Sequence, residues 1–322
     1  TILKTALTTI AGALLAISTT THAADQFPNK VIRMIVPLAP GGTGDTLART
    51  VGEEMGKQLN TNIVVDNRPG AGGLIGTETV ASAAPDGYTL INVSPSHVIN
   101  PALHTRKTYD PIKDFEAVIH IANTYQIIVA HPSMPAKTLK ELIDLAKKTP
   151  GKLSYGSAGT GSATHLNMEL FKSMAGVDIT HIPYKGSTFA RMDTVGGQVQ
   201  LAMDGLLPVL PLIKEGKLRP LGLTSSKRSQ IAPDIPTIGE TVPGYATDTW
   251  YGILVPTKTP KPIIATLHGA ALKAMNTPAT AARLKQLGTD PVGGTSEQFA
   301  KLIASEAKLW AKVVQVSGAK VN

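Results

Sequence analysis

Apolar runs alternate with amphipathic stretches along most of this chain, which predicts parallel strands joined by helices. The first run is Ile32–Val36, and the helix predicted behind it has an apolar residue at every fourth position, at Leu47, Val51, Met55 and Leu59. That spacing places the apolar residues on one face of a helix. A strand at 63–65, a helix at 74–84 and a strand at 88–93 complete a first series of three strands and two helices.

The same order appears again in the second half of the chain. A strand-like segment at 153–155 precedes a glycine-rich loop, a helix at 164–174, a strand at 179–182, a helix ending near 195 and a strand at 199–203. Because there are two copies, we expect two similar lobes and not a stacked repeat array. Two more apolar runs, at 125–130 and 250–256, are predicted to cross between the lobes as a two-strand hinge. Lobe 1 would then comprise residues 25–123 and 247–322, and lobe 2 residues 124–246.

The chain is predicted to end with a helix that packs across the first lobe. Its apolar residues fall on one face at helical spacing, at Phe299, Leu302, Ile303, Ala307, Trp310, Val313 and Val314. Glu306 interrupts this face, so we expect it either to find a partner or to reach the edge of the contact.

Residues 1–24 have the pattern of a signal peptide. Lys4 precedes a mostly apolar run from Ala6 to Ile17, and small residues follow up to Ala23 and Ala24. The run is shorter than the roughly 20 residues that span a bilayer. We therefore predict a periplasmic protein, with a buried N-terminal helix as the alternative interpretation of this segment.

The composition narrows the functional classes. Hydrophobic residues make up 42% and charged residues 17% of the 322 residues, as in a globular chain. The chain has no cysteine, which excludes disulfides, thiol catalysis and cysteine-based zinc sites. The formal net charge is +8, but the basic residues are scattered and no aromatic residues lie between them. We therefore predict no nucleic-acid partner, and a basic surface that attracts anionic solutes.

Two glycine-rich loops carry the candidate chemistry. Residues 40–44 and 156–162 each follow a strand and lead into a helix, at the sheet edge where ligands bind in parallel α/β folds. Unpaired N–H groups at a helix N-terminus favour an anion, and glycine lets a ligand approach the backbone. A pair of such loops, one from each lobe, predicts a site for a carboxylate. For each loop alone, the alternative is that it only turns the chain.

Three side chains near these loops need separate interpretation. His165, just inside the second helix, either contacts the ligand or supports the core. Asp204, at the end of the 199–203 strand, either accepts hydrogen bonds from a ligand or holds a loop. Asp45 is expected to cap the first helix, because its charge would repel a carboxylate.

The usual enzyme motifs are absent from the sequence. Neither Ser157 nor Ser162 has the flanking glycines of a nucleophile elbow, and there is no P-loop, dinucleotide fingerprint or HExxH motif. We therefore predict a protein that is not an enzyme and that needs no cofactor or metal. The alternatives are a secreted enzyme acting on a carboxylate, with His165 as its candidate base, and a ligand-free regulatory protein.

Several segments, taken in order, resemble the Bug family of extracytoplasmic receptors of tripartite tricarboxylate transporters. These segments are 36–45, 66–73, 85–90, 155–162 with His165, 183–186, 236–240 and 250–252. The resemblance implies an α/β, type II periplasmic-binding-protein fold with a ligand cleft between two lobes. It also implies a small carboxylate ligand, such as a di- or tricarboxylate, an acidic amino acid or an aromatic acid. Membrane transporter subunits or a sensor pathway would be the partners, and we expect a monomer.

The resemblance further implies that backbone and hydroxyl groups of both loops contact the ligand. Carried over residue by residue, it points to Gly41, Gly42, Thr43, Ser157, Ala158, Gly159, Thr160, Ser162, His165 and Asp204, with Ser94 and Ser96 as additions. Arg191 departs from the family, which usually carries an apolar residue there. We expect Arg191 to be exposed on its helix, the alternative being contact with a ligand carboxylate.

Overall fold

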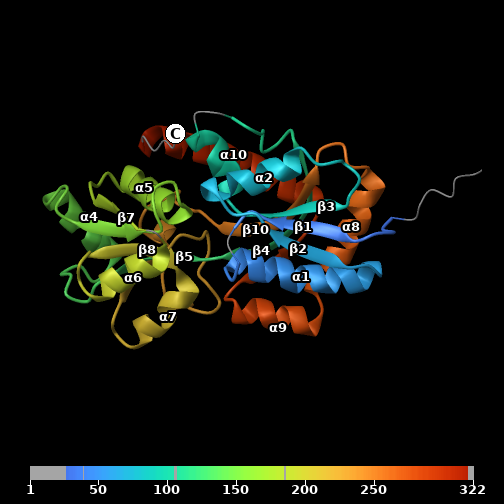
Figure 1. The fold of residues 1–322 in the computed structure, drawn as a ribbon. Helices are drawn as coiled ribbons and strands as arrows, with labels where there is room; N and C mark the ends of the chain where they lie inside the picture. Colours follow the sequence, from blue (N-terminus) through green and yellow to red (C-terminus); the bar gives the residue numbers. More distant parts are fainter. Residues whose placement is uncertain (1–26, 39, 105–106, 185, 318–322) are drawn as a thin grey trace, which may run out of the picture.

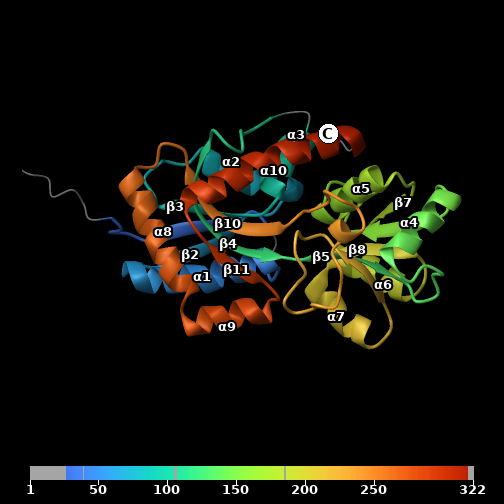
Figure 2. The same ribbon diagram turned by 180° about the vertical axis from the view of Figure 1, so that it is seen from behind.

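A computed structural model describes residues 27–38, 40–104, 107–184 and 186–317 of the chain. The predicted signal peptide, residues 1–24, lies outside these residues. The described chain forms two lobes that lie side by side, each built around its own sheet (Figures 1 and 2).

The sheet of lobe 1 has strands from three separate parts of the chain. Its order is β11 (Asp290–Gly293), β4 (Phe115–Thr124), β10 (Thr249–Pro256), β3 (Thr89–Val93), β1 (Ile32–Val36) and β2 (Ile63–Asn67). The strands β1, β2 and β3 are parallel, whereas β10 is antiparallel to both β3 and β4. The carboxyl ends of the three parallel strands therefore lie at one edge of the sheet.

The sheet of lobe 2 repeats this arrangement. Its order is β7 (Thr180–Pro183), β6 (Ser154–Ser157), β8 (Leu201–Gly205), β5 (Gln126–Ala130) and β9 (Arg219–Leu223). The strands β6, β7 and β8 are parallel and β5 is antiparallel to its neighbours. Each sheet thus receives one antiparallel strand directly from the segment that crosses between the lobes, which is the topology of a type II periplasmic-binding-protein fold.

Helices cover both faces of each sheet (Figures 1 and 2). In lobe 1, side chains of α1 (Thr43–Leu59) and α8 (Lys261–Met275) bury one face. The other face is buried by α2 (Leu74–Ala81), α3 (Ser96–Leu103) and α10 (Ser296–Ser317). In lobe 2, α4 (Leu139–Lys148) and α5 (Ala163–Ala175) face α6 (Ser187–Val195) and α7 (Leu206–Lys214) across the sheet. A further helix, α9 (Pro278–Gln286), packs beside α1.

The chain crosses between the lobes at two adjacent places. A single residue, Tyr125, separates β4 of lobe 1 from β5 of lobe 2. On the return, the Thr247 N–H donates to the Thr224 carbonyl and the Thr224 N–H donates to the Gln126 carbonyl, so both crossing segments are hydrogen-bonded together. The predicted two-strand hinge is confirmed.

The strands and helices predicted for both lobes are confirmed, with ends that differ by a few residues. Glu306 finds partners, because its Oε2 accepts hydrogen bonds from the indole N–H of Trp250 (3.3 Å) and of Trp310 (2.8 Å). The last helix, α10, packs on lobe 1 as predicted. It also contacts lobe 2, because Leu166 and Leu170 of α5 belong to the same apolar cluster.

Candidate functional site

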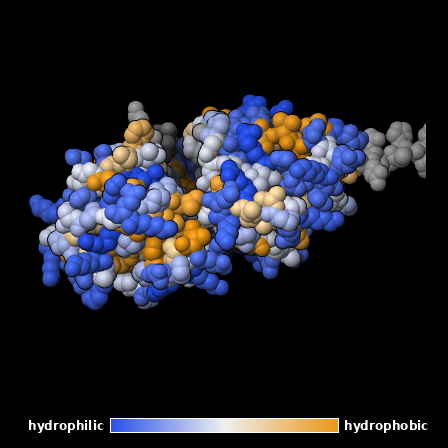
Figure 3. Space-filling view, turned by 90° about the horizontal axis from the view of Figure 1, so that it is seen from below, coloured by the Kyte–Doolittle hydropathy of each residue, from blue (hydrophilic) through white to orange (hydrophobic). Residues whose placement is uncertain are grey.

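A cavity of about 540 Å³ lies between the lobes and takes its lining from both. Lobe 1 contributes Leu38, the loop residues Ala71 and Gly72, the segment around Ser94 and Ser96, and one face of α3. Lobe 2 contributes Gln126 and, from the loop that leads into α5, Ala158 and residues 160–163. The boundary between the lobes is hollowed in the space-filling view (Figure 3). Another hollow, of about 620 Å³, lies along α1 and the edge strand β2 in lobe 1 alone, so it does not bring the predicted loops together.

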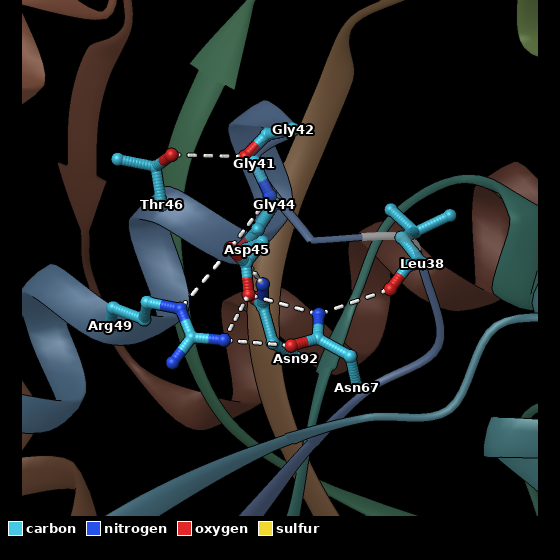
Figure 4. A network of polar contacts seen from close by, with 9 residues as sticks. All are labelled: Leu38, Gly41, Gly42, Gly44, Asp45, Thr46, Arg49, Asn67 and Asn92. Carbon is cyan, nitrogen blue, oxygen red and sulfur yellow. Dashed lines mark hydrogen bonds and ion pairs between the residues drawn. The ribbon is translucent and has the colours of Figure 1, made fainter.

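The first glycine loop is held in place by a buried carboxylate (Figure 4). Asp45 accepts hydrogen bonds from the Gly41 N–H (2.9 Å) and the Asn67 amide (2.9 Å), and it pairs with Arg49 at 3.0 Å. Burial raises the pKa of Asp45, but the hydrogen bonds from Arg49, Gly41 and Asn67 outweigh it and lower the pKa overall. Asp45 therefore fixes the loop in front of α1, but the prediction that it caps this helix is wrong, because the N-cap is Gly42 and no side chain accepts a capping hydrogen bond there.

Three predicted contacts from this loop do not line the cavity. Gly41 and Gly42 are exposed and Thr43 is half-buried, outside the lining residues. Lobe 1 instead lines the cavity through Ser94 and Ser96, whose hydroxyl oxygens lie 3.1 Å apart. Both serines follow β3 at the carboxyl edge of the sheet, where sequence analysis placed them.

In the second glycine loop, most backbone N–H groups already have partners. The Ala158 N–H donates to Thr164 Oγ1 (2.9 Å), the Gly159 N–H to Ser157 Oγ (3.1 Å), and the Gly161 N–H to His165 Nδ1 (3.1 Å). The glycines therefore shape the loop and do not present their N–H groups. Ala158, Thr160 and Ser162 line the cavity, whereas Ser157 is fully buried and Gly159 lies outside the lining.

The N-terminus of α5 keeps free donors. Ser162 caps this helix, since its Oγ accepts from the His165 N–H at 3.2 Å. The N–H groups of Thr160, Ala163 and Thr164 have no partner among the described residues. Thr160 and Ala163 line the cavity. These N–H groups, at the positive end of the helix dipole, can bind an anion.

Two stacked histidines support this loop from behind. The rings of His165 and His181 lie 4.1 Å apart between centroids, and Tyr155 stacks on His181 at 4.9 Å. His181 Nε2 lies 2.7 Å from Ser157 Oγ. Burial lowers the pKa of His165, and burial together with the neighbouring His165 lowers the pKa of His181 to about 4. Because a backbone N–H donates to Nδ1, His165 is neutral and supports the loop; it does not line the cavity.

Asp204 and Arg191 form a buried ion pair. Arg191 Nε lies 2.7 Å from Asp204 Oδ2, and the two side chains are 16% and 2% exposed. The prediction that Arg191 is exposed is wrong, because α6 turns this side chain inward over the end of β8. Burial raises the pKa of Asp204 more than Arg191 and the Gly205 N–H lower it. Asp204 holds this pair and the start of α7, and it lies outside the cavity lining.

Sequence analysis missed the side chains that close the cavity from α3 and β10. Ile99, Asn100 and Leu103 line it from α3, His104 lines it from just beyond the end of that helix, and Thr249 and Tyr251 line it from β10. The Tyr251 hydroxyl makes no hydrogen bond within the described chain, and burial raises its pKa to about 12. Tyr251 lies in the singled-out segment 250–252, but that motif did not mark it as a lining residue, and no motif marks the residues from α3.

Neither a metal site nor a membrane-spanning helix is found among the described residues. They contain no group of three or more histidine and carboxylate side chains placed to hold a metal ion. Every helix within them is too short or too polar to cross a bilayer.

Comparisons with known proteins point to one family. The model of the family described as tripartite tricarboxylate transporter family receptor matches residues 47–319. Protein BugT of Bordetella pertussis is 35% identical over 302 residues, covering 93% of each chain. The structure of R. palustris Rpa4515 with adipate is 35% identical, with a TM-score of 0.78, and the match covers 91% of this chain and 98% of that one. MatC from Rhodopseudomonas palustris with bound malate is 33% identical, with a TM-score of 0.75 and coverage of 89% and 100%.

Proposed function

Since this chain belongs to the receptor family of tripartite tricarboxylate transporters, we propose that its interlobe cavity binds a small carboxylate for delivery to such a transporter or to a sensor. The observation that carries this proposal is the free N–H of Ala163 at the start of α5, inside a cavity lined by both lobes. Relatives that hold adipate and malate support the same class of ligand.

A receptor accounts for the site better than an enzyme does. The candidate base, His165, accepts a hydrogen bond from Gly161 on Nδ1, and the residue is only 6% exposed. Ser157, the hydroxyl beside His181, is fully buried and cannot reach a substrate. Besides His104 and Tyr251, the polar groups that line the cavity are serine, threonine, amide and backbone groups, which bind and orient a ligand. The periplasmic location, removal of residues 1–24 and a monomeric state remain parts of this proposal.

Thermal unfolding with a panel of mono-, di-, tri- and aromatic carboxylates tests the proposal. A ligand that binds only the folded protein stabilises it by about 2.7 kcal/mol at a concentration 100 times its Kd. We expect a clear rise in Tm with at least one member of the panel. No rise with any carboxylate would contradict the proposal.

The substitution Ala163→Pro tests the donor itself. Ala163 is the first residue of α5, where proline is tolerated, and the extended Ser162 before it (φ −68°, ψ 158°) suits a following proline. The variant removes one N–H, so we expect about a tenfold loss of carboxylate affinity with unchanged stability of the free protein. Ala163→Gly, which keeps the N–H, is the matched control and should bind as the parent does.

A further inference from the structure

Gln126 lines the cavity beside the hinge. It is the first residue of β5 and follows Tyr125, the single residue between β4 and β5. Its carbonyl accepts a hydrogen bond from the Thr224 N–H, which fixes its backbone at this place. The residue is only 7% exposed although its side chain is polar. A polar side chain buried to this extent needs partners for its donor and for its acceptor.

One end of the Gln126 amide is already bound, which determines what the other end offers. Its Oε1 accepts a hydrogen bond from Asn167 Nδ2 at 2.7 Å, and Asn167 is itself only 2% exposed. Nε2 of Gln126 has no partner within the described residues and, unlike Asn167 Oδ1, it is not sealed off by its neighbours. Gln126 therefore presents N–H groups to the cavity, and these groups can bind only an acceptor such as a carboxylate oxygen.

The helix α5 brings this amide close to the free N–H of Ala163. Asn167 follows Ala163 by four residues, so both lie on one face of α5, about 6 Å apart along its axis. Side chains on a helix point toward the preceding turn, so Asn167 holds the Gln126 amide on the side of the helix N-terminus. Gln126 Nε2 and the Ala163 N–H are therefore neighbouring donors in the part of the cavity that lobe 2 lines.

We propose that Gln126 Nε2 donates a hydrogen bond to the carboxylate that binds the Ala163 N–H, and that Asn167 positions the amide for this contact. Among the described residues, no lysine, arginine, aspartate or glutamate lines the cavity, so neutral donors must replace the water that the carboxylate loses. This inference rests on the proposed function and adds to it a specificity-determining residue, one that requires an acceptor oxygen next to the hinge.

The variant Gln126→Glu tests the direction of this hydrogen bond. It keeps the oxygen that accepts from Asn167 but replaces Nε2 with a charged oxygen. Isothermal titration calorimetry with malate, adipate, citrate, glutamate and benzoate should show about a hundredfold loss of affinity for each acid that the parent binds. Equal affinities of Gln126→Glu and the parent would overturn the inference, because an oxygen of residue 126 would then face the ligand.

The matched control is Gln200→Glu, which adds the same charge to the same lobe. Gln200 also accepts through Oε1, from the Ser154 N–H at 2.8 Å, but it precedes β8 at the edge of the sheet away from the cavity. Its affinities should stay close to those of the parent. A loss as large as that of Gln126→Glu would mean that general repulsion causes the effect, and it would overturn the assignment.

Two uncharged variants separate the role of Gln126 from that of Asn167. Gln126→Met removes the amide and keeps the chain length, so affinity should fall about tenfold. Asn167→Leu should cause a smaller loss in the parent and no further loss in Gln126→Met, because Asn167 acts through Gln126. Additive losses would overturn the positioning role of Asn167.

These titrations also distinguish failure of the inference from failure of the proposed function. If the parent binds an acid and Gln126→Met binds it equally well, only the inference is overturned. If the parent binds none of the acids, the proposed function is overturned and the inference with it.

Discussion

Replacing His181 with glutamine should remove part of the acid sensitivity of the fold. The ring of His181 lies between those of Tyr155 and His165, with Nε2 at 2.7 Å from Ser157 Oγ. Burial and the neighbouring His165 lower its pKa to about 4, and Lys172 adds to this, while Glu169 opposes it. Glutamine keeps an acceptor near the position of Nε2 but cannot take up a proton.

The size of this loss of stability follows from the difference between the pKa of His181 in the folded state and in the unfolded state. The unfolded ring takes up a proton near pH 6.5, whereas the folded ring does so only near pH 4. The stabilisation from the neutral ring is therefore complete above pH 6.5 and is lost as the pH falls toward 4. Each pH unit in this window corresponds to about 1.4 kcal/mol, so a fall to about pH 4.5 costs ~3 kcal/mol. Because His181 is partly exposed, we expect about 2 kcal/mol.

Urea unfolding of the parent and of His181→Gln at pH 7 and at about pH 4.5 measures this difference. The parent should lose about 2 kcal/mol more than the variant does between the two pH values. Burial also lowers the pKa of His97 to about 4, but His97 is present in both proteins and its contribution cancels. Equal losses in the two proteins would refute the reasoning, because protonation of His181 would then carry no cost.

Two further substitutions test the packing around the site. Arg191→Ala leaves the carboxylate of Asp204 buried without its partner, so urea unfolding should show a loss of about 3–5 kcal/mol, and adding Asp204→Asn should recover much of it. Gly252→Ala places a methyl group against the Phe299 ring and 2.7 Å from the Ile119 carbonyl, so thermal unfolding should show a loss of about 1–3 kcal/mol. An unchanged Tm would mean that β10 and α10 can move apart.

The spacing of apolar residues along the chain was sufficient to predict the fold, because each lobe buries continuous apolar strands between amphipathic helices. Ile32–Val36 is almost entirely buried, and the helix stripe at Leu47 and Val51 packs directly on it. The helix α3 escaped prediction because it has only eight residues and contains Pro101, which interrupts a helical pattern. The lining side chains of Ile99 on this helix and of His104 just after it were therefore missed as well.

The position of the candidate site in the fold could be predicted from the sequence, but the hydrogen bonds within it could not. Strand order brings the loops to one edge of each sheet, and this follows from the sequence pattern. Which acceptor takes each loop N–H depends on residues distant in sequence, as when His181 of β7 reaches Ser157 at the end of β6. Likewise, Arg191 and Asp204 form an ion pair because α6 packs over β8. Their spacing in the sequence does not predict this pair.

The helix α10 makes different kinds of contact with the two lobes. Directional bonds hold this helix to lobe 1, since Glu306 of α10 accepts hydrogen bonds from Trp310 on the same helix and from Trp250 on β10. Its contact with lobe 2 is apolar, through Leu166 and Leu170 of α5. Hydrophobic contact is non-directional, so it tolerates a small slide that would break a buried hydrogen bond. If a ligand draws the lobes together, we expect α5 to slide along α10 while α10 stays with lobe 1, in addition to rotation at the hinge near Tyr125.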